Sequence, residues 1–219
     1  MFFFKPKAKD VSPIQDGWTI HQQDEDSTFW FTDKHDACRL QFTGRCSWPF
    51  DLSNAEAAKK FYQNQCSELG GALIEIGVEN IQGLESLVGV FKYHSPEPGS
   101  PAMYYVGIIW IPFEKCTYQI NFESLERGTT GAREAAVYLL QDQEPANDTE
   151  PVLIESPEEL ISLISKKKIE VLPSDSVEYD ETFPNHPLSK VRFLLNQFKK
   201  EASINSKLSS LKPYRNKNA

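Results

Sequence analysis

Four cysteines are the most reactive side chains in this 219-residue sequence: Cys38, Cys46, Cys66 and Cys116. A catalytic thiol needs a pKa lowered by a neighbouring cation or imidazole, and a structural zinc site needs closely spaced ligand pairs. No C-x-x-C pair occurs. Three of the cysteines share the parity of the apolar residues in alternating segments, and Cys66 lies on an apolar helical stripe. The pattern predicts four core thiols, since free cysteine is among the most buried residue types.

The histidines and carboxylates also lack the spacing of a catalytic or metal site. His21, His35, His94 and His186 occur in separate segments, without an i, i+4 pair. Only the tertiary fold could assemble a metal site from them, so the sequence predicts none. Most carboxylates belong to solvated turns and lack the contrasting environments that an acid–base pair needs, and the group of Glu123, Glu126 and Arg127 near the next helix is the exception. We therefore predict no catalytic residue, no metal and no cofactor.

The segment from Gly128 to Arg133 is the most similar to a binding site. Backbone N–H groups at a helix start, two hydroxyl groups and a guanidinium are able to hold an anion together. The segment matches neither of the glycine-rich phosphate-binding motifs, and a threonine N-cap after a glycine turn explains it equally well. The candidate anion-binding residues are Thr129, Thr130, Gly131 and Arg133.

Trp30 and the basic C-terminal region supply the candidate interface residues. Trp30 lies opposite Phe29 and Phe31 in strand parity, which predicts an exposed tryptophan. Residues 189–219 carry 8 basic and 1 acidic side chains, whereas residues 141–188 carry 3 basic and 12 acidic ones. The basic candidates are Lys190, Arg192, Lys199 and Lys200. They share a predicted helix with an apolar stripe of Leu188, Val191, Leu195 and Phe198, which we expect to pack on the rest of the protein.

The elements that would position these residues follow from periodicity. Residues 18–22 and 28–32 flank a polar turn and predict a hairpin, and residues 38–48 alternate strictly between apolar and polar. A capping box at Ser53 to Glu56 opens a helix that ends at Gly70. Four further strands are predicted at 74–79, 84–94, 103–113 and 116–123. Helices are predicted at 132–140, at 156–167 and from about 187.

Composition and charge limit the environment and the partners. The net charge of −8 argues against a general nucleic-acid-binding protein. The longest apolar stretch, 103–113, is far below the roughly 20 residues that span a bilayer, and the apolar start of the chain is too short for a signal peptide. We therefore expect a cytoplasmic protein without membrane insertion. We expect a flexible arm at 1–15, a core domain at 16–141, and an acidic linker followed by a helical extension at 142–219.

The order of the elements over residues 16–141 is hairpin, strand, helix, four strands and helix. This order resembles the PsbP-like family, named for an extrinsic subunit of photosystem II. The resemblance implies an α+β fold in which a central antiparallel sheet is flanked by helices, an α/β/α sandwich. It also implies a protein that binds partners without catalysis. The resemblance is one of element order, and it carries over no functional residue.

Three functional hypotheses remain at this stage. The leading one is a non-enzymatic protein-binding or accessory module, a role that suits bacterial accessory proteins by analogy of fold. The alternatives are a small hydrolase or transferase with a tertiarily assembled site, and a small-molecule or lipid-binding module. An exposed apolar patch without a deep pocket would favour the first hypothesis. Opposed pKa shifts in one pocket would favour the second, and a large apolar cavity the third.

Overall fold

The computed structural model describes residues 4–13, 17–34, 36–141, 156 and 168–216. Its centre is a seven-stranded sheet in the order β2-β3-β4-β8-β7-β6-β5, and every neighbouring pair is antiparallel. In that order the strands are Thr19–Gln23, Ser27–Phe31, Ala37–Gly44, Cys116–Leu125, Met103–Pro112, Leu84–His94 and Ala72–Ile81. The expected α+β class with a central antiparallel sheet is confirmed. No helix within the described ranges has the length and apolar character needed to cross a membrane.

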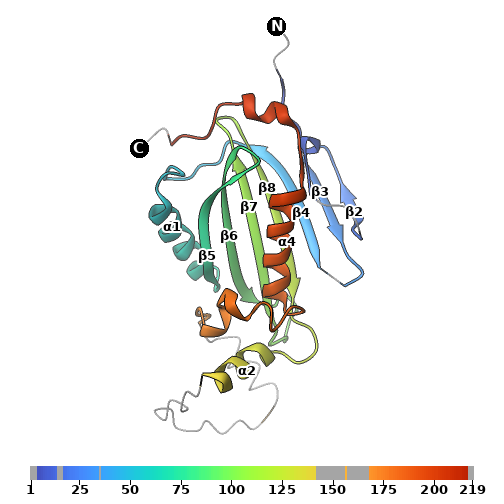
Figure 1. The fold of residues 1–219 in the computed structure, drawn as a ribbon, viewed down its shortest axis with the longest axis vertical. Coiled ribbons are helices and arrows are strands. Elements are labelled where there is room, and N and C mark those ends of the chain that lie inside the picture. Colours follow the sequence, from blue (N-terminus) through green and yellow to red (C-terminus); the bar gives the residue numbers. More distant parts are fainter. Residues whose placement is uncertain (1–3, 14–16, 35, 142–155, 157–167, 217–219) are drawn as a thin grey trace.

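Two helices cover opposite faces of this sheet at different places (Figure 1). Helix α1 (Ala55–Glu68) packs on β5, and its apolar residues join those of β5, β6 and β7 in one hydrophobic cluster. Helix α4 (Pro187–Glu201) packs on β7 and β8 on the other face, where a second cluster also includes residues of β3 and β4. A third helix, α2 (Ala132–Leu140), follows β8 and lies beyond the end of the sheet.

Helix α1 begins one residue later than the capping box predicts. The side chain of Asn54, not that of Ser53, accepts the backbone N–H of Ala57 at 3.0 Å. Asparagine is as good an N-cap as serine, so either position satisfies the first orphaned donors. The predicted end is correct: Gly70 adopts a φ of 71°, a left-handed conformation that favours glycine.

Helix α4 contacts the sheet through the predicted apolar stripe. Leu188, Val191, Leu195 and Phe198 are all buried in the cluster on its face of the sheet. The strand beneath is β7, and a Cβ atom on Gly107 would lie only 2.6 Å from the Val191 side chain. Glycine at this position therefore lets the helix approach the strand closely. The predicted docking of this helix on the sheet is confirmed.

The two ends of the described chain meet beside the sheet. Strand β1 (Val11–Ser12) follows the 3-10 helix η1 (Ala8–Asp10) and pairs with β9 (Ser203–Ile204), which precedes the 3-10 helix η4 (Ser206–Ser210). Val11 is fully buried, so residues 8–12 are not the flexible arm that was expected. Farther on, Tyr214 packs in the cluster beneath α1 and donates to the Trp48 carbonyl at 2.9 Å. The C-terminal segment thus contacts both hydrophobic clusters.

Three boundaries predicted from the sequence either differ from the structure or are not tested by it. Strand β4 ends at Gly44, so the alternating residues up to Trp48 continue beyond the strand. The predicted helix at 156–167 and the acidic linker lie almost wholly outside the described residues. The division of the chain near residue 141 stays a prediction, although α4 supplies part of the core of the preceding residues.

Candidate functional site

The face of the sheet that carries α1 is uncovered over β3, β4 and β8 in the described structure. No residue of these three strands belongs to the cluster beneath α1. Alternation along the strands places seven partly exposed side chains on this uncovered area, which we call the open face: Phe29, Phe31, Arg39, Gln41, Gln119, Asn121 and Glu123. The strands β2 and β3 continue the sheet beyond α4 (Figure 1).

A directed chain of hydrogen bonds runs across the β8 side of the open face. The Trp110 indole donates to Gln119 Oε1 at 2.9 Å, and Gln119 Nε2 donates to Asn121 Oδ1 at 3.0 Å. Asn121 Nδ2 donates to Glu123 Oε1 at 3.5 Å, and the Tyr104 hydroxyl also donates to the Glu123 carboxylate. Burial and then the Glu123 charge raise the pKa of Tyr104, so it remains a donor at neutral pH. These polar groups are therefore held in fixed orientations at a solvent-facing surface.

Aromatic rings and one arginine form the β2–β3 side of the same face. The Arg39 guanidinium lies 5.0 Å from the centre of the Phe29 ring, within the range of a cation–π contact. Phe29 and Phe31 pack edge to face at 4.4 Å, and His21 on β2 contacts both rings. Arg39 forms no hydrogen bond or ion pair with the residues that the structure describes. Among the described residues, it is therefore a positioned cation without a carboxylate partner at ion-pair distance.

The predicted exposure of Trp30 is wrong. Its side chain is buried with 9% exposed, in the cluster on the α4 side of the sheet, whereas Phe29 and Phe31 occupy the open face. The sequence correctly places Trp30 on the opposite face of β3 from Phe29 and Phe31. The covered face, however, is the one that carries Trp30. Trp30 is therefore a core residue and not an interface residue.

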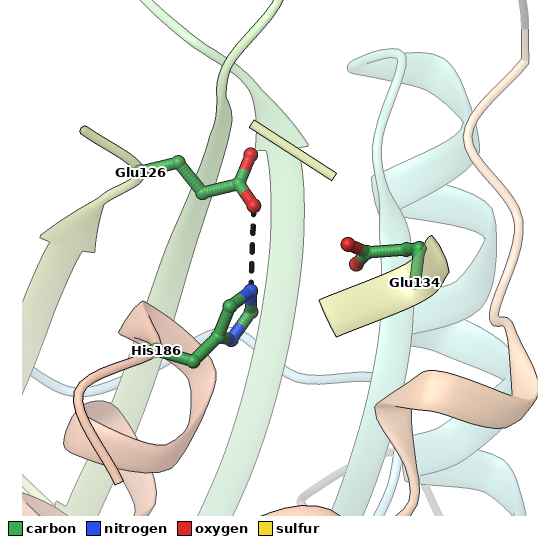
Figure 2. A group of neighbouring side chains, drawn as sticks. All are labelled: Glu126, Glu134 and His186. Atoms are coloured by element: carbon green, nitrogen blue, oxygen red, sulfur yellow. Dashed lines mark hydrogen bonds and ion pairs between the residues drawn. The ribbon is translucent and has the colours of Figure 1, made fainter. Parts of the chain in front are cut away.

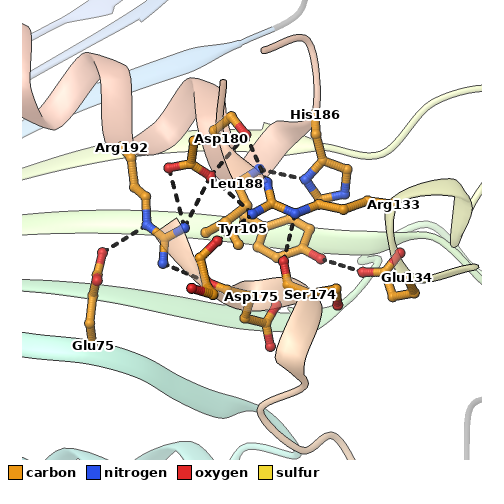
Figure 3. A network of polar contacts seen from close by, with 12 residues as sticks. Glu75, Tyr105, Arg133, Glu134, Ser174, Asp175, Asp180, His186, Leu188 and Arg192 are labelled. Atoms are coloured by element: carbon orange, nitrogen blue, oxygen red, sulfur yellow. Dashed lines mark hydrogen bonds and ion pairs between the residues drawn. The ribbon is translucent and has the colours of Figure 1, made fainter. Parts of the chain in front are cut away.

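Arg133 and Arg192, two predicted site residues, are buried in one polar network around Asp180 (Figure 3). Asp180 Oδ1 lies 3.0 Å from Arg133 Nη2 and 3.1 Å from Arg192 Nη1. Arg133 also donates to the carbonyls of Ser174 and Ser176, and Arg192 donates to Glu75 and to the Asp175 carbonyl. The two guanidiniums hold the segment before α4 against the sheet, which is a structural role.

A buried ion pair fixes the same segment to β6. Lys92 Nζ and Asp175 Oδ2 are 2.6 Å apart, and their side chains are 3% and 2% exposed. Asp175 Oδ2 also accepts the backbone N–H of Leu172 at 2.7 Å. Breaking such a pair by removing one partner costs about 3–5 kcal/mol, because a charge is left uncompensated.

Glu126, Glu134 and His186 converge from three elements beside this network (Figure 2). Glu126 follows β8, Glu134 belongs to α2, and His186 is the N-cap of α4. One ligand atom from each lies within 4.8 Å of the other two. His186 Nε2 is 3.3 Å from Glu126 Oε1, and the Tyr105 hydroxyl is 3.5 Å from Glu134 Oε1. The sequence could not reveal this cluster, because the three residues are far apart in the chain.

The candidate anion-binding residues are only partly brought together. Thr129 and Arg133 line a cleft of roughly 400 Å³ with Lys34 and His186, whereas Thr130 and Gly131 are not among the lining residues. The N-cap of α2 is Gly131, not a threonine, and the Gly131 N–H faces Glu126 Oε1 at 3.5 Å. The Glu126 carboxylate thus faces the N-terminus of α2, and the Arg133 guanidinium donates its hydrogen bonds to other groups of the protein. Anion binding here stays a prediction.

The remaining basic candidates lie on the outer part of α4. Lys190 pairs with Asp36 at 3.3 Å, and Lys199 pairs with Glu79 on the edge strand β5 at 3.0 Å. Lys200 is exposed. These positions do not form a common surface with Arg192, which is buried. Their assignment as an interface stays a prediction.

Three of the four thiols are core residues, as predicted, and Cys46 is not fully buried. Cys38, Cys66 and Cys116 are buried, and Cys46 is partly exposed in the segment after β4. Burial raises the pKa of all four, and that of Cys116 reaches about 11. A nucleophilic or metal-binding thiolate requires the opposite shift.

Comparison with known proteins yields only distant structural similarity. No protein-family model matches the chain, and no curated protein matches it. The Ran-binding protein Mog1p of Saccharomyces cerevisiae superposes with a TM-score of 0.45 at 9% identity, over 90% of each chain. A point mutant of protein Mog1 gives a TM-score of 0.45 at 10% identity, over 90% of this chain and 91% of that chain. This degree of similarity carries no functional argument, and the PsbP-like resemblance stays a prediction.

Proposed function

We propose that this protein is a non-enzymatic protein-binding module whose open face is the binding surface. The observation that carries this proposal is Arg39, a guanidinium that is stacked on Phe29, partly exposed and unpaired within the described structure. Arginine and aromatic side chains dominate the energetics of protein interfaces. A stacked arginine loses little conformational entropy on binding, because its position is already restricted.

The surroundings of Arg39 define the chemistry of the partner. The guanidinium fits a carboxylate from an aspartate or glutamate of the partner, which would form a charge-assisted pair. The neighbouring rings of Phe29 and Phe31 offer apolar contact area, and the polar chain from Gln119 to Glu123 offers oriented donors and acceptors. We therefore infer a partner surface with an acidic residue beside an apolar side chain.

The experiment compares partner binding by the wild type and by Arg39→Ala. Proteins captured from the native host by the wild type are identified, and the affinity of each purified partner is then measured by calorimetry. We expect Arg39→Ala to weaken binding roughly thirtyfold, the effect of losing a hot spot of about 2 kcal/mol. Its fold should be retained, since Arg39 makes no hydrogen bond with the described residues.

Lys200→Ala is the matched control, because it removes an exposed cation from α4. We expect it to leave the affinity unchanged. A partner that binds Arg39→Ala as tightly as the wild type but loses affinity for Lys200→Ala would overturn the proposal. Such a result would assign binding to the basic surface of α4 instead.

A further inference from the structure

The cluster of Glu126, Glu134 and His186 takes no part in the open face, and its composition points to a different ligand. We propose that it binds one divalent transition-metal ion of the Zn²⁺ class. The ligands are a carboxylate oxygen from each glutamate and Nε2 of His186. One nitrogen and two carboxylate ligands suit zinc or manganese, whereas calcium and magnesium prefer oxygen ligands alone.

The spacing of the ligand atoms is close to that of a formed site. Zinc bonds of about 2.0–2.2 Å in a tetrahedral arrangement place neighbouring ligand atoms roughly 3.3–3.6 Å apart. His186 Nε2 and Glu126 Oε1 are 3.3 Å apart, and all three ligand atoms lie within 4.8 Å of one another. The Glu134 carboxylate points toward the other two groups (Figure 2). Glu134 therefore needs only a small movement to complete the set.

An unsatisfied carboxylate oxygen is the second observation. Glu134 Oε2 is buried and has no hydrogen-bond partner in the part of the chain that the structure describes. No basic side chain of the described residues forms an ion pair with Glu134, although Glu126, with a second carboxylate, lies beside it. Buried polar atoms without a partner are rare in native proteins, and a bound ion is one way in which such an atom is satisfied. A divalent cation would satisfy this oxygen and compensate both carboxylates.

The surrounding residues supply support and access. The backbone N–H of Met103 donates to Glu126 Oε2 at 2.8 Å, and the Tyr105 hydroxyl is 3.5 Å from Glu134 Oε1. Hydrogen bonds between ligand side chains and neighbouring groups orient the ligands toward the metal. Glu126 and His186 also line the cleft of roughly 400 Å³, which gives a hydrated ion a route to the site. Three protein ligands leave a fourth position for water.

Ion binding would change the tautomer of His186. Its Nδ1 accepts the backbone N–H of Leu188 at 3.2 Å, so the neutral ring carries its proton on Nε2, facing Glu126. Coordination through Nε2 leaves the proton of the neutral ring on Nδ1, and the Leu188 N–H loses this acceptor. Because the Nδ1–H cannot accept this donor, the cost is that of an unsatisfied N–H group, about 1–3 kcal/mol, which is still well below typical metal-binding free energies. The tautomer exchange is a specific signature of the proposed site.

The test titrates the full-length protein with ZnCl₂. Calorimetry should show one saturable site, and the ring nitrogens of His186 should exchange their NMR shifts as the tautomer changes. CaCl₂ should produce neither effect. Glu134→Gln keeps the side-chain size and removes a ligand, and His186→Asn removes a ligand while retaining an N-cap. We expect each variant to weaken Zn²⁺ binding at least tenfold.

Cys46→Ser is the control for zinc binding at the partly exposed thiol, and it should bind as the wild type does. The proposal fails if the wild type shows no saturable binding at millimolar Zn²⁺. It also fails if Glu134→Gln and His186→Asn bind Zn²⁺ as tightly as the wild type, since the ion would then occupy another place. Circular dichroism confirms that both variants are folded.

Discussion

Desolvation is the largest cause of the raised pKa at each of the four cysteines. The degree of burial differs among them, because Cys46 lies after the end of β4, whereas the others lie on elements that face a hydrophobic cluster. Accessibility and thiolate fraction both limit the reaction with an alkylating or disulfide reagent. The four thiols should therefore differ in rate within one folded molecule.

We expect a disulfide reagent at pH 8 to label folded molecules slowly, at fewer than one cysteine per molecule on average. Cys46 should carry the label, and all four cysteines should react after denaturation. Mass spectrometry of the digested protein identifies the labelled position, and Cys46→Ser should abolish labelling in the folded state. Rapid labelling of Cys38 would contradict its burial in the core and would reopen the question of a catalytic thiol.

The residues of β3 show how far sequence alone leads at this scale. Alternation correctly separates Trp30 from Phe29 and Phe31. It cannot decide which face is covered, because that depends on where α1 and α4 dock. The cluster of Glu126, Glu134 and His186 is a stronger example. No local pattern connects these residues, since their proximity results from the turn after β8 and from the packing of α4.

At the scale of elements, the contact between α4 and β7 is a close approach of a helix to the sheet that depends on a glycine. The apolar stripe of α4 was predictable from its 3.6-residue period. The receiving surface was not, because Gly107 lies in a strand whose other residues are large. A Cβ atom at this position would lie 2.6 Å from Val191 Cγ1 and 2.7 Å from Leu195 Cδ1. Both distances are too short unless these side chains or the helix that carries them move.

We therefore expect Gly107→Ala to lower the free energy of unfolding by about 1–3 kcal/mol, the usual cost of overpacking a core. Urea denaturation followed by tryptophan fluorescence measures the change. Gly77→Ala on β5 is the matched control, because a Cβ atom there would meet no atom within 4 Å. Equal stability of the two variants would show that α4 does not press on β7 at this position.

At the scale of the whole molecule, the core consists of two clusters on opposite faces of one sheet, and the C-terminal region belongs to both. The stripe of α4 and Leu208 enter one cluster, and Tyr214 enters the other. The element order over 16–141 was sufficient to predict the sheet. It was not sufficient to show that the following region closes the core, since long-range packing has no signature in local periodicity.

A chain that ends at residue 141 tests whether the predicted boundary is real. The buried side chains that it lacks include six large apolar or aromatic members of the two hydrophobic clusters: Leu188, Val191, Leu195, Phe198, Leu208 and Tyr214. Burial stabilises by about 1.5–3 kcal/mol for each such side chain, so their loss of roughly 9–18 kcal/mol is comparable with the whole stability of a domain, about 5–15 kcal/mol. We expect this chain to bind a hydrophobic dye and to unfold without a cooperative transition.

A chain that ends at residue 216 is the control and should unfold as the full-length protein does. Cooperative unfolding of the shorter chain, near the midpoint of the full-length protein, would establish residues 16–141 as an independent domain and reduce α4 to a docked appendage.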